Sequence, residues 1–297
     1  MAATPDVAIP TLNWLVTSEH QLLSVITQPD RPAGRGRSLK ESVVSEWARQ
    51  HDIACLKPAS VTETATLIEG ADVLLTIGYG VLLPENLLSI PKHGCLNLHF
   101  SLLPRWRGAA PVQRAIEAGD SLSGVTVFAL DPGMDTGPIY SVKRFALDSD
   151  ITSDELFSEL GVLGVEAVED SLKAIEAGIR PEPQKNDGAT RAMKISKDEC
   201  EIDWKLDAQL ISQKIRAFTS LPGAWTRFRS EVVKIDSVSI SEEILQPGVL
   251  KVVNKELLVG TASEALSIGF LTPAGKSRMD AKSWLNGARV NDGEFFG

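Results

Sequence analysis

The sequence predicts an α/β protein in two parts: a doubly wound, mostly parallel sheet, followed by a small antiparallel β-barrel. Over the first 180 residues, short apolar runs alternate with amphipathic runs, and this βαβα order is typical of a parallel sheet. Beyond residue 225 the chain breaks into five short alternating runs separated by turns, which favours a small barrel. The 297 residues are enough for about two domains of roughly 150 residues each.

The first part should alternate regularly between strands and helices. Strands are expected where apolar residues run together, and helices where apolar residues recur at three- and four-residue spacing. Residues 28–40, rich in Pro, Gly and Arg, should form a loop without regular structure. The expected strands are 21–27, 54–57, 71–77, 95–100, 124–130 and 138–147, and the expected helices are 4–17, 42–51, 61–68, 84–89, 112–118 and 153–177.

The start of the chain is unusual for this fold. Thr4, Pro5 and Asp6 are typical of a helix start, and only three residues precede them, too few for a strand of ordinary length. The first strand of a doubly wound sheet lies centrally, so its absence should leave a vacant position flanked by Ile26 and Thr76. Either the start codon is misassigned or the chain is a shortened form with a damaged sheet, and we favour misassignment. As written, the chain is expected to be poorly soluble or inactive.

The second part follows residues 181–192, which are rich in Pro, Asn, Asp and Gly and are the best linker candidate. An amphipathic helix is expected next, and then the strands of the barrel. These observations predict a domain at 1–178, a linker at 179–193 and a second domain at 194–297. The expected helix is 207–218, and the expected strands are 226–228, 232–238, 248–253, 256–259 and 266–271.

Composition excludes several classes of protein. Cys55, Cys95 and Cys200 are widely spaced with no Cys-x-x-Cys pair, which excludes a disulfide scaffold and a cysteine-based zinc site and suits a reducing cytoplasm. With only four histidines, a metal enzyme is not expected. No apolar run approaches the roughly 20 residues of a membrane span, and no secretory signal is visible. We therefore expect a cytoplasmic monomer without a metal or a membrane partner.

The net charge of −9 does not by itself suggest a nucleic-acid partner, so its distribution matters. Residues 1–180 hold 14 Lys and Arg against 23 Asp and Glu, whereas residues 181–297 hold 16 against 16. Basic side chains nevertheless gather locally, at Arg31, Arg35 and Arg37 of one loop. Such a patch suits a protein that grips a limited length of phosphate backbone.

The strongest chemical signal lies between residues 94 and 137. Asn97 and His99 are two apart in an expected strand, so their side chains point to the same face, about 7 Å apart along the backbone. They stand at the carboxyl end of that strand, where open α/β sheets bind their ligands. Asp135 follows after one helix and one strand, held between turn residues.

Each member of this trio has a purely structural explanation when taken singly. Asn97 and His99 could form a solvated strand end, and an Asp among glycines is usually a turn former. Together, however, the three supply an oxyanion donor, a proton-transfer group and a carboxylate, which acyl transfer to an amine requires. The combination favours catalysis without naming the reaction.

These residues resemble the signature of the formyltransferases that use 10-formyltetrahydrofolate. The resemblance is carried by Asn97-x-His99-x-Ser-Leu-Leu-Pro followed by Asp135. Within that superfamily, residues 105–113 (Arg-Trp-Arg-Gly-Ala-Ala-Pro-Val-Gln) and residues 27–37 are similar to methionyl-tRNA formyltransferases, and these two segments are the more specific ones. Later segments match as well, so the resemblance covers nearly the whole chain.

The resemblance implies a Rossmann-like catalytic domain and an oligonucleotide-binding-like, tRNA-binding barrel. The implied reaction moves the formyl group of the co-substrate 10-formyltetrahydrofolate to the amino group of methionyl-initiator tRNA, giving formylmethionyl-tRNA for translation initiation, without a metal. Asn97 would donate to the developing oxyanion, while the division of proton transfers between His99 and Asp135 stays open.

The resemblance also implies two binding segments. Phe100 departs from the small residue usual at its position, and its side chain should face away from the site. In the arginine-rich loop, Arg31, Arg35 and Arg37 match a segment that enters the tRNA acceptor stem. The residues that match the folate-contacting segment are Ser101, Leu102, Leu103 and Pro104.

Two other functions stay open. A formyltransferase acting on a small nucleotide or sugar amine would keep Asn97, His99 and Asp135, but would have no reason to carry the arginine-rich loop or the barrel. An RNA-binding protein in which a decayed domain supports the barrel is the third possibility, and the intact trio argues against it.

Overall fold

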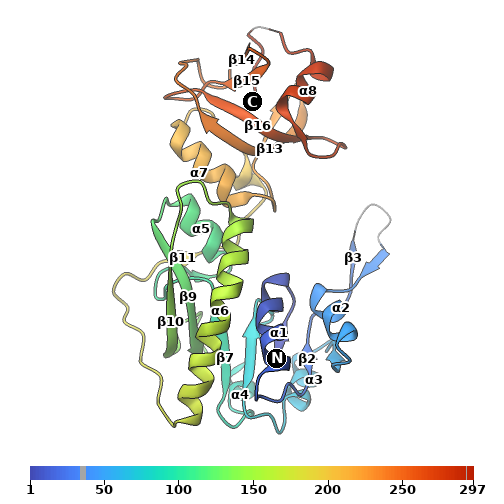
Figure 1. The fold of residues 1–297 in the computed structure, drawn as a ribbon, viewed down its shortest axis with the longest axis vertical. Coiled ribbons are helices and arrows are strands. Elements are labelled where there is room, and N and C mark those ends of the chain that lie inside the picture. The colour runs from blue at the N-terminus through green and yellow to red at the C-terminus, as the bar shows by residue number, and fades with distance from the viewer. Residues whose placement is uncertain (34–37, 292) are drawn as a thin grey trace. The chain divides into compact units, whose positions relative to one another are not determined.

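The structure, a computed structural model, describes residues 1–33, 38–291 and 293–297 (Figure 1). The chain folds into two compact units. The last segment of the first unit ends at Ala192. The domain boundaries predicted at 178 and 193 stay predictions. The first unit contains Met1–Pro111, Leu122–Ala146 and Phe157–Ala192, and the second contains Val112–Ser121, Leu147–Leu156 and Met193–Gly297.

A seven-stranded sheet with the strand order β10-β9-β7-β6-β1-β2-β5 forms the centre of the first unit. The five strands from β7 to β5 pair in parallel, and β9 and β10 add antiparallel strands at one edge. The expectation of a mostly parallel sheet is confirmed. The strands are β1 Ala2–Ala3, β2 Val25–Ile26, β5 Cys55–Leu56, β6 Leu74–Ile77, β7 Cys95–His99, β9 Leu122–Ala129 and β10 Ile139–Ala146.

The helices of the first unit begin where the sequence provides caps. The hydroxyl of Ser42 accepts a hydrogen bond from the N–H of Ser45, and the hydroxyl of Ser60 accepts one from the N–H of Glu63. These caps explain why two expected helices start within a residue of their predicted positions. The helices are η1 Asp6–Ala8, α1 Ile9–Thr17, α2 Val43–Gln50, α3 Val61–Leu67, α4 Glu85–Leu88 and α6 Ser153–Glu176.

Helix α6 covers one face of β7. Gly164 of α6 comes so close to β7 that an added Cβ would stand 2.6 Å from Leu98 Cδ2. The ring of Phe100 meets the edge of Phe157 from the same helix, with 6.0 Å between ring centroids. The prediction that Phe100 faces away from the polar pair is therefore confirmed. Because side chains alternate along a strand, Asn97 and His99 are left on the opposite face.

The expected vacancy at the centre of the sheet is wrong. Ala2 and Ala3 form β1, which lies between β2 and β6 and pairs with both. The N–H of Ile26 donates to the carbonyl oxygen of Met1 over 2.8 Å, so the ladder begins at the first residue. Strands β2 and β5, on one side of β1, are also only two residues long. Because the strands on this side of the sheet are so short, a two-residue strand is long enough to fill the central position.

Two stretches expected to be irregular contain strand pairs. In the arginine-rich loop, β3 (Arg31–Ala33) pairs antiparallel with β4 (Ser38–Lys40). In the expected linker, β11 (Arg191–Ala192) pairs in parallel with β8 (Arg107–Gly108). Pairs of two or three residues have too few side chains to show a period in the sequence, so pattern analysis missed them.

The second unit is built on an antiparallel sheet with the order β12-β13-β16-β15-β14, with β17 pairing to β16. Its core includes aromatic side chains that meet edge to face or at a tilt, among them Phe228, Trp284 and Phe296. Helix α8 was not expected, although Asp280 caps it by accepting from the N–H of Ser283. The elements are α5 Pro111–Glu117, η2 Asp198–Cys200, α7 Ala208–Phe218, β12 Trp225–Phe228, β13 Glu231–Ile240, β14 Leu250–Val253, β15 Glu256–Val259, β16 Leu266–Pro273, β17 Met279–Asp280 and α8 Ala281–Ala288.

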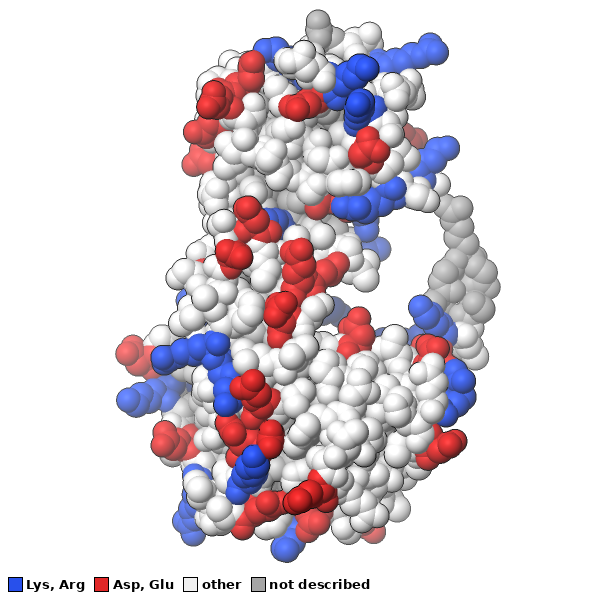
Figure 2. Space-filling view, viewed as in Figure 1, with Lys and Arg blue, Asp and Glu red and all other residues white. Residues whose placement is uncertain are grey.

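Charged side chains of both signs are mixed on the surface. On the face shown in Figure 2, basic and acidic side chains of the described residues are interspersed among uncharged areas. Within residues 1–33, 38–291 and 293–297, no helix combines the length and the apolar character needed to cross a membrane.

The central place of β1 leads to a stability prediction. Ala2 is fully buried in a core cluster that includes Ile26, Leu74 and Cys95. Ala2→Leu should lower the free energy of unfolding by about 1–3 kcal/mol, because extra methylenes overfill a packed core. Ala177→Leu, at an exposed position just after α6, is the control and should change it by no more than about 0.5 kcal/mol. Urea unfolding of both variants is the measurement, and an unchanged midpoint for Ala2→Leu would contradict a packed central strand.

Candidate active site

The polar pair of β7 lies in the middle of the sheet rather than on an edge. Asn97 pairs with Thr76 of β6 on one side and with Phe128 of β9 on the other, and His99 pairs with Thr126 of β9. Both side chains therefore rise from a strand that its two neighbours hold in register. Strand β7 is where the sheet changes from parallel pairing, with β6, to antiparallel pairing, with β9.

His99 is buried, and its hydrogen bonds define its protonation. Its Nε2 lies 2.9 Å from the carbonyl oxygen of Trp106, and since a carbonyl oxygen only accepts, Nε2 carries the proton. Nδ1 then carries a lone pair and stands 3.7 Å from Oδ2 of Asp135. Burial lowers the pKa of His99 from its ordinary value, although the charge of Asp135 and the bond to Trp106 oppose this. Burial therefore favours the neutral form of the imidazole.

Asp135 is held by its backbone and by a neighbouring strand. Its φ of 53° lies in the left-handed region, which non-glycine residues seldom adopt. The backbone N–H of Gly108 in β8 donates to Oδ2 of Asp135 over 2.7 Å. The same oxygen that faces His99 is therefore fixed by a peptide group, so the two side chains meet in one defined geometry. The structure brings together His99 and Asp135, which are 36 positions apart in the sequence.

The amide of Asn97 is oriented by the strand beside it. The hydroxyl of Thr76 lies 2.9 Å from both the carbonyl oxygen of Leu96 and Oδ1 of Asn97, and its single proton is shared between these two acceptors. With Oδ1 engaged, the NH2 group of Asn97 points away from Thr76. Among the described residues, that NH2 group donates no hydrogen bond. It is a half-buried donor aimed along the face that also carries His99.

The segment after β7 forms a tightly bonded turn. The buried hydroxyl of Ser101 donates to the carbonyl oxygen of Arg105 over 2.7 Å. The hydroxyl of Thr126 donates to the carbonyl oxygen of Ser101 and accepts from the N–H of Leu103, at 2.7 and 3.2 Å. Leu102 and Pro104 are half-exposed, whereas Ser101 and Leu103 are buried. Folate binding by these four residues stays a prediction.

The arginines predicted to bind tRNA are only partly within the described residues. Arg31 is exposed in β3, and its guanidinium donates to the side-chain oxygen of Gln28. Gln28 in turn donates to the carbonyl oxygen of Tyr79 over 2.7 Å, which ties this end of the loop to the sheet. Arg35 and Arg37 lie outside the described residues.

Sequence reasoning missed three residues of the site: Thr76, Gly108 and Gln184. Thr76 carried a detectable signal, since it is the one polar side chain in an apolar strand. Gly108 lies within residues 105–113, a segment that the sequence analysis singled out. Its contact with Asp135 nevertheless depends on the pairing of β8 with β11, which lies far away in the sequence. Gln184 lies in a stretch that resembles a linker, and no pattern marks it.

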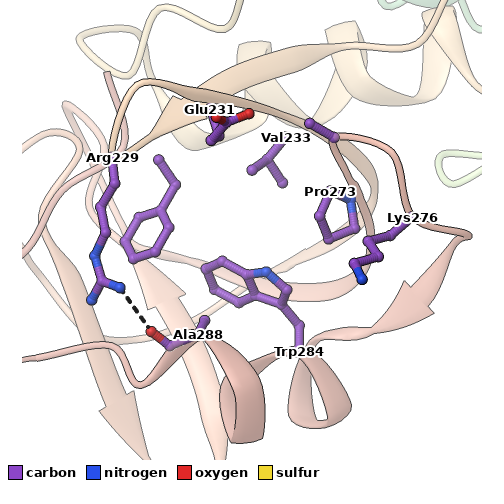
Figure 3. A pocket seen from close by; sticks show the side chains of 9 residues that line it. Arg229, Glu231, Val233, Pro273, Lys276, Trp284 and Ala288 are labelled. Atoms are coloured by element: carbon purple, nitrogen blue, oxygen red, sulfur yellow. Dashed lines mark hydrogen bonds between the residues drawn. The ribbon is translucent and has the colours of Figure 1, made fainter.

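The second unit contains a separate pocket of about 290 Å³, to which neither Asn97, His99 nor Asp135 contributes (Figure 3). Trp284 and Val233 lie between Arg229 on one side and Lys276 on the other. The guanidinium of Arg229 is occupied, because it donates to both carboxylate oxygens of Glu294 and to the carbonyl oxygen of Ala288. The pocket walls are mainly apolar.

No group of three or more His, Cys, Asp or Glu side chains in the described part of the chain is arranged to hold a metal ion. Asn97, His99 and Asp135 themselves offer groups for proton transfer and for hydrogen bonding. A buried neutral imidazole beside a carboxylate can move a proton, and a neighbouring amide N–H can stabilise negative charge on oxygen.

Comparison with known proteins covers almost the whole chain. Residues 4–170 match the formyl transferase family, and residues 194–289 match the formyl transferase C-terminal domain. A methionyl-tRNA formyltransferase of Salinispora tropica is 43% identical over 99% of this chain and 97% of its own, and one of Rhodococcus erythropolis is 41% identical over 98% and 96%. The fold is similar to that of an N-formyltransferase from Helicobacter canadensis in complex with folinic acid and dTDP-3-aminofucose. That structure has a TM-score of 0.66 at 18% identity, over 90% of this chain and 97% of that one.

The close approach of β8 to β11 leads to a prediction about Gly108. A Cβ added to Gly108 would stand 2.5 Å from the carbonyl oxygen of Ala192, at a φ of 126°. Gly108→Ala should therefore separate the two strands and lower the free energy of unfolding by about 1–3 kcal/mol. Gly188→Ala is the control, since Gly188 also has a positive φ but nothing within 4 Å of the added Cβ. Urea unfolding should show the larger loss for Gly108→Ala, and equal losses would contradict the close approach.

Proposed function

This chain belongs to the methionyl-tRNA formyltransferase family, and from that membership we propose how its residues carry out the reaction. The protein transfers a formyl group from 10-formyltetrahydrofolate to the amino group of methionyl-initiator tRNA. The observation that carries the proposed mechanism is the pairing of a neutral His99 with Asp135, on the same strand face as the unengaged NH2 group of Asn97.

Asn97 stabilises the oxygen of the formyl group. When bound, the folate supplies the formyl carbon, and attack by the amino nitrogen places negative charge on the formyl oxygen. The NH2 group of Asn97 donates a hydrogen bond to that oxygen, which strengthens as the charge develops. Thr76 keeps the amide in the orientation that makes this possible, because its hydroxyl engages Oδ1.

His99 and Asp135 handle the proton that the reaction displaces. As the new N–C bond forms, the attacking nitrogen must lose a proton, and Nδ1 of His99 has the lone pair to accept it. Asp135 stabilises the imidazolium at 3.7 Å without taking the proton itself. When the bond from the formyl carbon to the folate nitrogen breaks, His99 returns the proton to that nitrogen. The enzyme therefore ends the cycle in its starting protonation state.

The tRNA is bound by segments outside the catalytic trio. The loop with Arg31, Arg35 and Arg37 enters the acceptor stem, as the family resemblance implies, with Arg35 at the first base pair, and its positive charge favours contact with the phosphates. The antiparallel sheet of the second unit forms an oligonucleotide-binding-like barrel that adds further contacts. Ser101, Leu102, Leu103 and Pro104 border the folate, with the half-exposed Leu102 and Pro104 the two whose side chains can reach it.

The choice of acceptor tests the function directly. Purified protein and 10-formyltetrahydrofolate should formylate methionyl-initiator tRNA and leave a dTDP-linked amino sugar unchanged. Mild hydrolysis of the aminoacyl ester, followed by separation of the released amino acids, would reveal formylmethionine. Formylation of the amino sugar in preference to the tRNA would support the runner-up, a formyltransferase for small amines, and would overturn the proposal.

Asn97 should be needed for turnover and hardly at all for binding. Asn97→Ala removes the oxyanion donor, so kcat should fall by roughly 10²–10³ with little change in folate affinity. Thr76→Val keeps the donor but releases the amide from its fixed orientation, so its loss should be smaller, on the order of tenfold. Steady-state kinetics would distinguish the two, and near-normal turnover in Asn97→Ala would remove Asn97 from the mechanism.

The arginine-rich loop should affect one substrate only. Arg35→Ala should raise KM for methionyl-tRNA while leaving KM for the folate unchanged, because the loop is expected to contact only phosphates of the tRNA. A salt titration should show the slope of log K against log salt reduced by about one unit for each lost phosphate contact. Unaltered kinetics for both substrates would mean that the loop has no part in tRNA binding.

A further inference from the structure

Gln184 makes two hydrogen bonds to the turn that carries Asp135. Its Nε2 donates to the carbonyl oxygen of Asp135 over 3.0 Å and to that of Gly137 over 2.7 Å. Both protons of one NH2 group are therefore used on a single turn. The carboxylate of Asp135 is fixed by Gly108, and the backbone on which it is mounted is fixed by Gln184.

The orientation of this amide is itself enforced. Oε1 of Gln184 accepts from Nε and from a terminal nitrogen of Arg107, at 3.2 and 2.8 Å. A flipped amide would turn its NH2 group toward the guanidinium, which has only donors to offer. Arg107 therefore ensures that the donors of Gln184 face the turn. Gly108, the residue after Arg107, reaches the same aspartate from the other side.

The segment around Gln184 is anchored at both ends. Glu182 exchanges two backbone hydrogen bonds with Ile139, at 2.7 and 2.8 Å, directly after the turn. Arg191 and Ala192 pair with Arg107 and Gly108 as β11 and β8. Gln184 therefore lies on a stretch of chain that is bonded to the first unit on either side of it. The stretch predicted to be only a linker carries a residue of the site.

The turn requires such support because its conformation is unfavourable. Asp135 has a φ of 53°, in the left-handed region. A residue in the left-handed region persists only when its surroundings hold it there. The two hydrogen bonds from Gln184 are accepted by backbone carbonyl groups of this turn, so they act directly on its backbone conformation.

We propose that Gln184 is a positioning residue for formyl transfer, which holds Asp135 in line with His99 by binding the carbonyl groups of its turn. Gln184 touches no reacting atom and acts through Asp135. This inference rests on the proposed function for its kinetic part, and on the geometry of the turn for the rest.

The test compares substitutions that remove different bonds. Gln184→Met keeps the length of the side chain and loses every hydrogen bond, whereas Gln184→Glu keeps the acceptor for Arg107 and loses both donors. Both should lower kcat roughly 10- to 100-fold, with KM for 10-formyltetrahydrofolate unchanged within a factor of about two. Asn186→Ala is the matched control, because Asn186 contacts Arg107 at 3.5 Å from the same segment but does not touch the turn. It should leave kcat near that of the wild type.

A second measurement does not depend on activity. The pKa of His99, followed by NMR, should fall in Gln184→Met, because a displaced Asp135 no longer raises it, and should not move in Asn186→Ala. Unchanged kcat in Gln184→Met, or an unchanged pKa of His99, would each overturn the inference. If the wild type fails to formylate methionyl-tRNA, the proposed function is wrong, and the NMR titration still decides the role of Gln184.

Discussion

One hydrogen bond, from Nε2 of His99 to the carbonyl oxygen of Trp106, determines the state of the whole site. It holds the proton on Nε2, so the lone pair of Nδ1 faces the carboxylate of Asp135. Two acceptors that face each other without a proton are unfavourable in a buried site, and a substrate that brings an N–H group relieves this. Burial favours the neutral imidazole, while the carboxylate beside it favours the imidazolium.

That hydrogen bond depends on residues far away in the sequence. Trp106 has a φ of 63°, and its N–H donates to the hydroxyl of Thr190 over 2.9 Å. The next residue, Arg107, donates its N–H to the carbonyl oxygen of Thr190. The carbonyl that orients His99 and the peptide group that fixes Asp135 therefore lie on one short strand, β8, or next to it. Because β8 is held by β11, the last segment of the first unit takes part in building the geometry of the candidate site.

The parts of the fold that follow from local patterns could be predicted from the sequence. The helices expected at 42–51 and 61–68 begin within a residue of those positions, and alternation along β7 placed Asn97 and His99 on one face. Strand β1 could not be predicted, because two alanines show no periodicity. A strand of ordinary length was expected at the start of the sheet, and three residues were too few for one. The contacts of Gln184 could not be found either, since its partner Arg107 is 77 positions away in the sequence and such a distant contact leaves no local signal.

The proposed proton transfer depends most directly on the tautomer of His99. Nitrogen-15 NMR of the free protein at neutral pH can distinguish the two ring nitrogens, and the signal can be assigned among the four histidines with a His99→Gln variant. A protonated Nε2 and an unprotonated Nδ1 are the predicted result, since the carbonyl oxygen of Trp106 accepts from Nε2. An Nδ1–H tautomer, or an imidazolium with both nitrogens protonated, would contradict the account, because His99 could then take no proton from the attacking amine.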